Sequence, residues 1–349
     1  MSNVTVSTWD LRIGSAVIKM GGIGGVWTDE NHRMKGYARR VMEDAIRMMQ
    51  EEDFDVSALF GITDFYDKFG FAVALPEYKL MLTTREAERA QKRFRIRKIR
   101  KKDWEALLDL YAQSNRTRTG SAVRSLSEWK GFRMGSRWHV RAEALLITDD
   151  AGAPLAYAVY DDVRDRCAVA EVGYGDEAAF ETLVHALVRR AVALRTEKIT
   201  LFLPPDHPFS AFCRRYGCDV QITYPRNGNG MMRIIHLKPL MQKVCPVLEE
   251  RLQRATHTSA WQGKSSIYTD IGAVTLVRDH KGLHVHEHSL DAPYRLDLPQ
   301  SKLIQLIMGY RPIRDLLLDP DVTATDAFVP MLEVLFPPGY PYIWWPDRF

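Results

Sequence analysis

The chain is poor in several features that would define its class at once. Its 349 residues include only four cysteines, and no two of them form a C-x-x-C pair. A chain of this length with so few cysteines does not depend on disulfides. It also lacks a run of about 18 uncharged apolar residues and a basic-then-apolar signal pattern at its polar N-terminus. We therefore expect a soluble protein of the reducing cytoplasm, with no membrane partner.

An excess of charge is missing as well. The chain has 48 basic and 44 acidic residues, a formal net charge of +4, which does not indicate a polyanionic partner. The densest basic run, residues 92–102, contains Phe94 and Ile96 in alternation with arginines. That spacing favours a strand with one buried face over a nucleic-acid contact.

A metal site has weak support. His284, His286 and His288 alternate along an expected strand and would share one face of it. Because no cysteine or carboxylate of suitable spacing joins them, exposed strand histidines are favoured over metal ligands, and we expect no metal.

The length predicts two or three domains, because one hydrophobic core rarely organises 349 residues. Residues 1–83 alternate strand, helix, strand, short helix and strand, which is typical of an α/β domain with a mixed sheet. The expected strands are residues 4–8, 15–19, 56–62 and 78–82, with a helix at 35–52 and a short segment at 64–69. Residues 94–242 form a second α/β domain, with strands at 94–97, 144–148, 156–160, 168–172 and 199–203 and helices at 104–111 and 177–195.

Residues 243–349 form a smaller third α/β domain. Helices are expected at residues 246–254 and 300–308, and strands at 265–271, 273–279 and 284–288. The tail, residues 336–349, is rich in proline and aromatic residues, and we expect it to pack against another domain.

An internal repeat joins the first two domains. Residues 64–73 align without gaps with residues 211–220, and Phe, a basic residue, an aromatic residue, Gly and Val coincide. This match favours two copies of one fold. Measured from the match, the first copy is about fifty residues shorter at its front than the second. We expect either a truncated sequence or a protein without that first strand and its helices.

The residues with the clearest chemistry lie between an apolar strand and an amphipathic helix. Arg33, Gly36 and Ala38 form an R-x-x-G-x-A motif, and Lys35 adds charge. Backbone N–H groups at a helix start can bind a pyrophosphate, and glycine lets the ligand approach. By itself the motif is weak, since a plain helix start with solvated basic residues fits it too. Its context of strand, helix, strand and the Phe65–Phe71 segment is more specific.

Together, R-x-x-G-x-A and the Tyr66-x-x-Phe-Gly-Phe segment resemble the GCN5-related N-acetyltransferase (GNAT) superfamily over residues 4–82. The resemblance implies acetyl-CoA as co-substrate, held in a gap between two central strands. It assigns Val26, Trp27 and Thr28 to the pantetheine and thioester, and Phe60, Gly61 and Ile62 to the facing strand. The phosphates would lie on Arg33, Met34, Lys35, Gly36, Tyr37, Ala38 and Arg39. Met34 replaces the family's second arginine.

Tyr66 is the expected proton donor to the leaving CoA thiolate, with a purely structural aromatic as the alternative. In the second copy, the helix at 177–195 has no glycine, no R-x-x-G-x-A precedes it, and Cys213 aligns with Tyr66. We expect that copy to be degenerate, with Cys213 a buried structural residue rather than a reactive thiol.

Two GNAT-like domains followed by a small third domain resemble the enhanced intracellular survival (Eis) acetyltransferases, whose third domain is similar to sterol carrier protein. In that family the C-terminal carboxylate acts as general base, which implies this role for Phe349; a merely packed terminus is an equal alternative. The resemblance also implies amine acceptors such as aminoglycosides or lysine side chains, and a homohexamer. A non-catalytic protein that binds acetyl-CoA or an apolar ligand is the second hypothesis for function.

Overall fold

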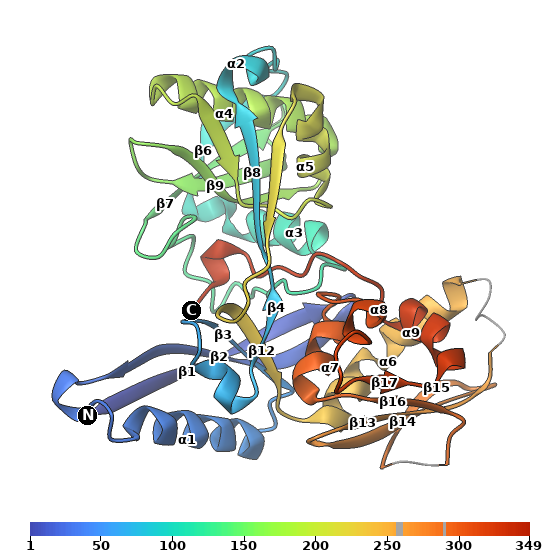
Figure 1. Ribbon diagram of the computed structural model, residues 1–349. Helices are drawn as coiled ribbons and strands as arrows, with labels where there is room; N and C mark the ends of the chain where they lie inside the picture. The colour runs from blue at the N-terminus through green and yellow to red at the C-terminus, as the bar shows by residue number, and fades with distance from the viewer. Residues whose placement is uncertain (256–260, 289–290) are drawn as a thin grey trace.

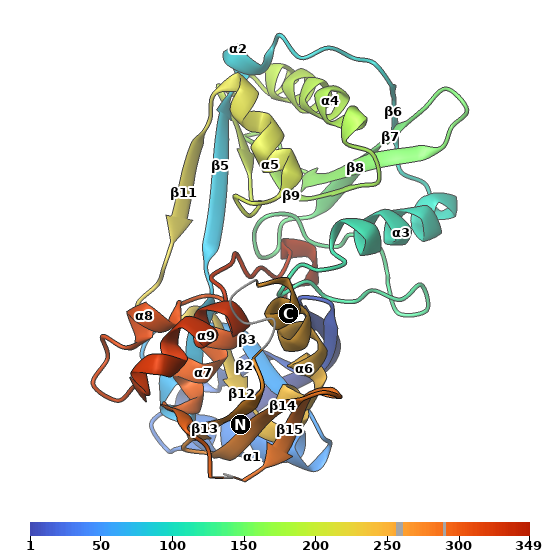
Figure 2. The ribbon, with the colours of Figure 1, turned by 90° about the vertical axis from the view of Figure 1, so that its right-hand side faces the viewer.

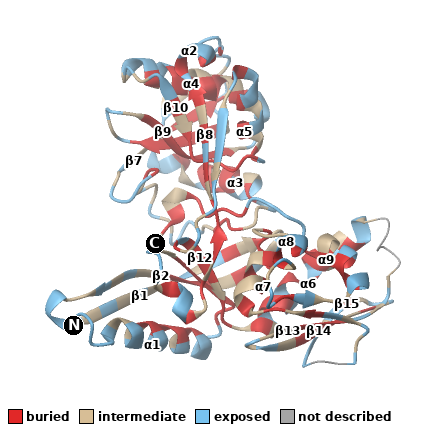
Figure 3. Ribbon diagram, in the orientation of Figure 1, coloured by how far each residue is buried: buried red, intermediate tan, exposed pale blue. Residues whose placement is uncertain are grey.

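The structure is a computed structural model, and it describes residues 1–255, 261–288 and 291–349 (Figure 1). The described residues form three sheets with helices packed on them, so the expected mixed α/β class is confirmed. Buried residues follow the central strands of the sheets and the helix faces that cover them (Figure 3). No helix in the described ranges is long and apolar enough to cross a membrane.

The first sheet has the strand order β1-β2-β3-β12-β4. Its strands are β1 (Ser2–Ile13), β2 (Ala16–Thr28), β3 (Val56–Gly61), β4 (Ala72–Leu75) and β12 (Asn229–Ile234). Helix α1 (Tyr37–Glu51) covers one face, because Met42, Ala45, Ile46 and Met49 recur at helical spacing and are all buried. Helix α6 (Leu237–Arg254) covers the other face, where Val247 contacts the turn at Gly14.

The second sheet has the order β11-β5-β10-β9-β8-β7-β6. Its strands are β5 (Glu77–Thr83), β6 (Arg95–Lys98), β7 (Ala142–Thr148), β8 (Pro154–Asp161), β9 (Cys167–Tyr174), β10 (Lys198–Leu201) and β11 (Asp219–Thr223). The helices are α2 (Thr84–Ala87), α3 (Trp104–Ser114), α4 (Phe180–Ala193) and α5 (Pro208–Cys213), with the 3-10 turns η3 (Lys101–Asp103), η4 (Glu177–Ala179) and η5 (Arg214–Tyr216). In β6 the Ile96 side chain packs on the core while Arg95 is exposed, as the alternation predicts.

The two sheets exchange strands. Strand β5 lies between β10 and β11 of the second sheet, and β12 lies between β3 and β4 of the first. Figure 2 shows β5 and β11 side by side. The expectation that the strand at residues 78–82 belongs to the sheet of residues 1–83 is therefore wrong. The alternation of buried Tyr78, Leu80 and Leu82 specifies a strand with one core face, but it does not specify which sheet supplies the neighbours. Predicted boundaries at 1–83 and 94–242 consequently do not coincide with the sheets.

Strand order reveals the repeat more clearly than the sequence does. The first sheet reads β1-β2-β3-β12-β4, and the corresponding part of the second reads β8-β9-β10-β5-β11. In both, an antiparallel pair leads to a parallel pair, and the strand contributed by the other copy follows.

The third sheet has the order β15-β14-β13-β16-β17. Its strands are β13 (Gly263–Thr269), β14 (Gly272–Asp279), β15 (Gly282–Glu287), β16 (Tyr294–Asp297) and β17 (Thr323–Ala324), and its helices after α6 are α7 (Gln300–Ile307), α8 (Ile313–Leu316) and α9 (Val329–Leu335), with the 3-10 turn η6 (Asp326–Phe328). The helix predicted from residue 246 in fact begins at Leu237. Pro246 is usual at a helix start but lies inside α6 here.

The C-terminal tail runs from the third domain along the second to the first (Figure 1). Tyr342, Ile343 and Trp344 are fully buried, and the 3-10 turn η7 (Trp345–Asp347) precedes the terminus. The Tyr342 ring lies 5.4 Å from the ring of Tyr78 on β5. The prediction that the tail packs against another domain is confirmed.

Candidate active site

Strands β2 and β3 separate within the first sheet. Their parallel ladder runs from the Met20–Val56 pair to the Ile23–Leu59 pair and stops there, although β2 continues for five more residues to Thr28. A β-bulge accounts for the separation. Thr5 pairs with Gly24, but Asn3 pairs with Trp27, so β2 carries one extra residue. A bulge bends its strand, and the left-handed φ of 57° at Gly25 accommodates it.

A cavity of about 680 Å³ lies at this opening, between the end of β2, the start of α1 and the end of β3. Most of the predicted coenzyme residues line it: Val26, Trp27, Thr28, Arg33, Met34, Gly36, Tyr37, Ala38, Arg39 and Ile62, together with Tyr66. His32 and Phe65 also line the cavity, although neither was predicted as a coenzyme contact. His32 belongs to the turn η1 (Glu30–His32), and only its position next to Arg33 in the sequence could have suggested such a contact.

Two predicted coenzyme residues do not line the cavity. Lys35 donates from Nζ to the carbonyl of Asn31 at 3.0 Å. Gly61 lies behind the Tyr66 ring, and a side chain at this position would collide with that ring. Gly61 therefore makes room for Tyr66 rather than contacting a ligand in the cavity.

The N-terminus of α1 is suited to an anion. Gly36, the N-cap, has a left-handed φ of 77° and supplies no side-chain hydrogen bond, and the first turn contains no acidic residue. The first N–H groups of a helix have no intrahelical partner, and the helix dipole favours negative charge beside them. Arg33 and Arg39 add positive charge at the same cavity. This end of the cavity fits the phosphates of a nucleotide coenzyme.

The corresponding helix start in the second copy is occupied by acids. The Asp176 side chain accepts a hydrogen bond from the Ala178 N–H, and Glu177 and Glu181 lie in the first turns of η4 and α4. These carboxylates would repel a phosphate, whereas the first turn of α1 has no acidic residue. Cys213 is fully buried, and burial raises the pKa of its thiol, so it is no ready nucleophile.

Tyr66 begins the short 3-10 turn η2 (Tyr66–Phe69) immediately beyond β3. Its ring packs at 4.9 Å from Phe65 and 6.5 Å from Phe71. Burial raises the pKa of the Tyr66 phenol above its ordinary value. A phenol with a raised pKa keeps its proton at neutral pH, so Tyr66 can act there as a proton donor and not as a base.

Phe349 lies on the face of β2 opposite to α1. A side chain at Gly24 would come within 3.1 Å of the Phe349 carboxyl carbon, and one at Gly22 within 2.8 Å of its ring. The ring is also 5.8 Å from Trp9 and 5.9 Å from Phe60. Glycines at both positions thus allow the C-terminal carboxylate to reach the point where β2 and β3 part.

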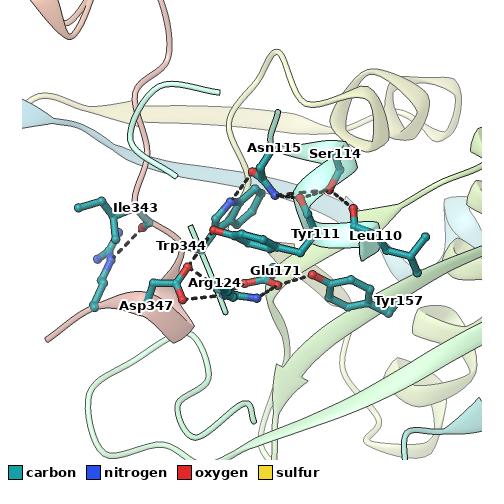
Figure 4. A network of polar contacts seen from close by, with 11 residues as sticks. Leu110, Tyr111, Ser114, Asn115, Arg124, Tyr157, Glu171, Ile343, Trp344 and Asp347 are labelled. Atoms are coloured by element: carbon teal, nitrogen blue, oxygen red, sulfur yellow. Dashed lines mark hydrogen bonds and ion pairs between the residues drawn. The ribbon is translucent and has the colours of Figure 1, made fainter. Parts of the chain in front are cut away.

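Ion pairs on both sides hold the residues that precede Phe349. Arg348 makes a two-pronged pair with Glu77 at 2.7 and 3.0 Å. Asp347 accepts two bonds from Arg124, at 2.8 and 2.9 Å, and a third from the Tyr111 hydroxyl at 3.0 Å (Figure 4).

The Asp347 contacts belong to a buried network that includes Glu171 of β9, beyond the last pair of the β9–β10 ladder. Arg124 also binds both oxygens of Glu171, which accepts from the Tyr157 hydroxyl at 2.6 Å (Figure 4). The Trp344 indole donates to Asn115 at 2.8 Å in the same network. Thus buried polar contacts hold the tail against the second sheet, and its terminus lies against β2 of the first sheet.

We expect Arg124→Met to lower the free energy of unfolding by about 3–5 kcal/mol at pH 7.5, since it leaves two buried carboxylates without their cation. Burial raises the pKa of Glu171, and Arg124 opposes that rise. Without Arg124 this pKa rises further above its unfolded value. A carboxyl group whose pKa is higher in the folded than in the unfolded state destabilises the fold as pH rises. The difference in free energy of unfolding between the parent and Arg124→Met should therefore be smaller at pH 5 than at pH 7.5. Denaturant unfolding of both proteins at pH 7.5 and pH 5 measures this difference. An equal difference at the two pH values would show that Glu171 does not take up a proton in the variant.

The histidines of the third domain remain apart from this site. His284 and His286 are exposed on β15, and His284 lies 3.7 Å from Asp279. Within the described ranges, no three His, Cys, Asp or Glu side chains group closely enough to hold a metal ion.

The part of the chain that lines the cavity matches a known protein family. Residues 1–74 match the family model described as "Acetyltransferase (GNAT) domain". A search of curated proteins finds no match. Among solved structures, a probable N-acyltransferase from Enterococcus faecalis superposes with a TM-score of 0.80 at 17% identity, over 100% of this chain and 86% of that one.

Two further structures share the fold. A GCN5-related N-acetyltransferase from Anabaena variabilis gives a TM-score of 0.76 at 16% identity, over 99% of this chain and 86% of that one. Eis1 from Mycobacterium abscessus gives 0.69 at 15% identity, over 100% and 87%. The likeness to these structures thus extends over the whole chain and includes an Eis protein.

Proposed function

We propose, from the premise that residues 1–74 of this acyltransferase are a GNAT acetyltransferase domain, that the chain moves an acetyl group from acetyl-CoA to a primary amine by direct attack. One observation carries the proposal. The opening between β2 and β3 has an uncapped helix start at one end and the C-terminal carboxylate at the other. A nucleotide thioester and an amine could therefore meet in it from opposite sides.

The coenzyme would be held mainly by backbone. Phosphates would accept hydrogen bonds from N–H groups of Gly36, Tyr37 and Ala38, with Arg33 and Arg39 beside them. Val26 to Thr28 do not pair with β3, so backbone groups of this segment could bind the pantetheine and the thioester carbonyl. The Thr28 carbonyl already accepts a long hydrogen bond from Arg33 Nε at 3.4 Å. Acetyl-CoA supplies the activated acetyl group.

The reaction forms one N–C bond and breaks one C–S bond. The Phe349 carboxylate accepts the proton that the amine nitrogen loses, either directly or through a water molecule. Tyr66 donates its phenolic proton to the departing thiolate, and exchange with solvent restores both groups. Products are the acetamide and free CoA thiol. The acceptor would be a small molecule or a lysine side chain.

The decisive experiment measures thiol release from acetyl-CoA with a panel of primary amines, beside calorimetry of coenzyme binding. Release that depends on an amine supports the transferase. Binding without release from any amine would replace it with the second hypothesis, a non-catalytic binding protein.

The phosphate site can be tested without harming the helix. Ala38→Asp places a carboxylate in the first turn of α1, where it stabilises the helix but repels phosphate. We expect the Kd for CoA to rise at least about 10-fold, with no fall in melting temperature. Ala112→Asp on the exposed face of α3 adds the same charge elsewhere and should leave the Kd unchanged. If both variants bind CoA with the same affinity, the phosphates do not bind at the start of α1.

A further inference from the structure

We infer that the acceptor is an amine on an aromatic or apolar body that carries a negative charge, and that the turn at residues 135–140 selects it. This inference rests on the proposed function and names its substrate class. It implies that polycations such as aminoglycosides are poor acceptors.

The acceptor side of the opening follows from the glycines of β2. Alternate residues of a strand point to opposite faces. A side chain on Gly21 would collide with Met49 of α1, whereas Gly22 and Gly24 face Phe349. An amine that meets the Phe349 carboxylate therefore approaches from the face away from α1.

Aromatic rings form the wall on that face. Phe60 lies 5.9 Å from Phe349 and 6.2 Å from Trp138, and Trp138 lies 5.9 Å from Trp345. On the other side of Phe349, Trp9 donates to the hydroxyl of Ser7 at 2.8 Å. Trp138 is 41% exposed, so its ring is available to a bound molecule. This wall fits a flat or apolar body beside the amine.

Negative charge on this wall is scarce. Arg348, over the Phe60 ring at 4.4 Å, is neutralised by its pair with Glu77. The rings of Trp9, Phe60, Trp138 and Trp345 carry no charge, and the Phe349 carboxylate can balance only one ammonium group. A polycation would bring further charges that this face does not compensate.

The turn that bears Trp138 is held in place by hydrogen bonds, and its exposed side chains are basic. The Gly135 N–H donates to the Val140 carbonyl at 2.8 Å, and Ser136 binds the buried Asp161 carboxylate through its N–H at 2.6 Å and its hydroxyl at 3.0 Å. Three arginines are exposed on and next to the turn: Arg133, Arg137 and Arg141.

These arginines have no ion-pair partner in the part of the chain that the structure describes. Arg137 directly precedes Trp138 and is exposed, so it can meet an anionic group on a molecule stacked against that ring. A partly exposed ion pair contributes up to about fivefold in affinity.

The test uses the full chain, acetyl-CoA and thiol release with phenethylamine, its para-carboxylate and its para-trimethylammonium analogue, besides spermidine and kanamycin. We expect the highest kcat/KM for the carboxylate, about fivefold above phenethylamine. Both polyamines should lie at least about tenfold below the carboxylate. Arg137→Glu should reverse the order of the carboxylate and trimethylammonium compounds while phenethylamine stays within about twofold. Arg85→Glu, on the distant helix α2, is the matched control and should keep the order.

Preference for a polyamine, or an unchanged charge order in Arg137→Glu, would overturn this inference alone, because transfer to an amine would still occur. Trp138→Ala should raise KM for phenethylamine with kcat retained, and an unchanged KM would also count against the site. Coenzyme binding with no thiol release from any amine would reject the proposed function, and the inference with it.

Discussion

A glycine-serine extension after Phe349 should lower kcat about 100-fold or more, with the Kd for CoA within about twofold of the parent. The extension converts the terminal carboxylate, which lies at Gly24 where β2 and β3 part, into an amide without basicity. A positioned proton acceptor contributes about 10²–10⁴ in rate. Steady-state thiol release and calorimetry give the two quantities.

Phe349→Leu separates the base from a packing role. This variant keeps the terminal carboxylate but loses the ring contacts with Trp9 and Phe60. If the carboxylate is the base, kcat should stay within about tenfold of the parent. If the extended chain and Phe349→Leu lose activity equally, the terminus matters only through packing, and the proposed base is wrong.

Local elements were predictable from the sequence because local patterns determine them. The buried stripe of α1 recurs at helical spacing, and β3 and β5 are continuously apolar or alternate, so these three elements were recognised. The strands β4, β11, β12 and β16 were not predicted. The exchange of β5 and β12 was not predictable, because alternation defines a core face and not a partner strand. Pro246 misplaced a helix start for a related reason: packing of α6 between two sheets outweighs the local preference.

The residues of the proposed coenzyme end could be named from the sequence for a physical reason. Most of them lie in one stretch, residues 26–39, and the motif from Arg33 to Ala38 places a helix start within it. The acceptor end is assembled from parts of the chain more than 300 residues apart, such as Trp9 and Phe349. Phe349 was indicated only by a resemblance, and Trp138 by nothing in its own surroundings, since its contact with Phe60 joins two domains.

Tyr66→Phe should lower kcat with acetyl-CoA about 100-fold or more and leave coenzyme affinity nearly unchanged. The ring would still fill the space beside Gly61, so the loss isolates the phenolic proton. Because burial raises the pKa of Tyr66 above its ordinary 10.0, any alkaline fall in kcat from this group should have its midpoint above pH 10, and kcat at pH 10 should exceed half of its plateau value. Rates measured from pH 6 to 10 check that limit.

Tyr37→Phe is the matched control, since Tyr37 lines the same cavity with a phenol and is partly exposed; it should stay within about threefold of the parent. A thioester whose leaving group is a strongly acidic thiol, such as an S-nitrophenyl thioacetate, needs no proton donor to expel its thiolate. On that substrate the parent and Tyr66→Phe should therefore differ by less than about threefold. A defect of equal size on both thioesters would show that Tyr66 shapes the cavity and does not protonate the leaving group.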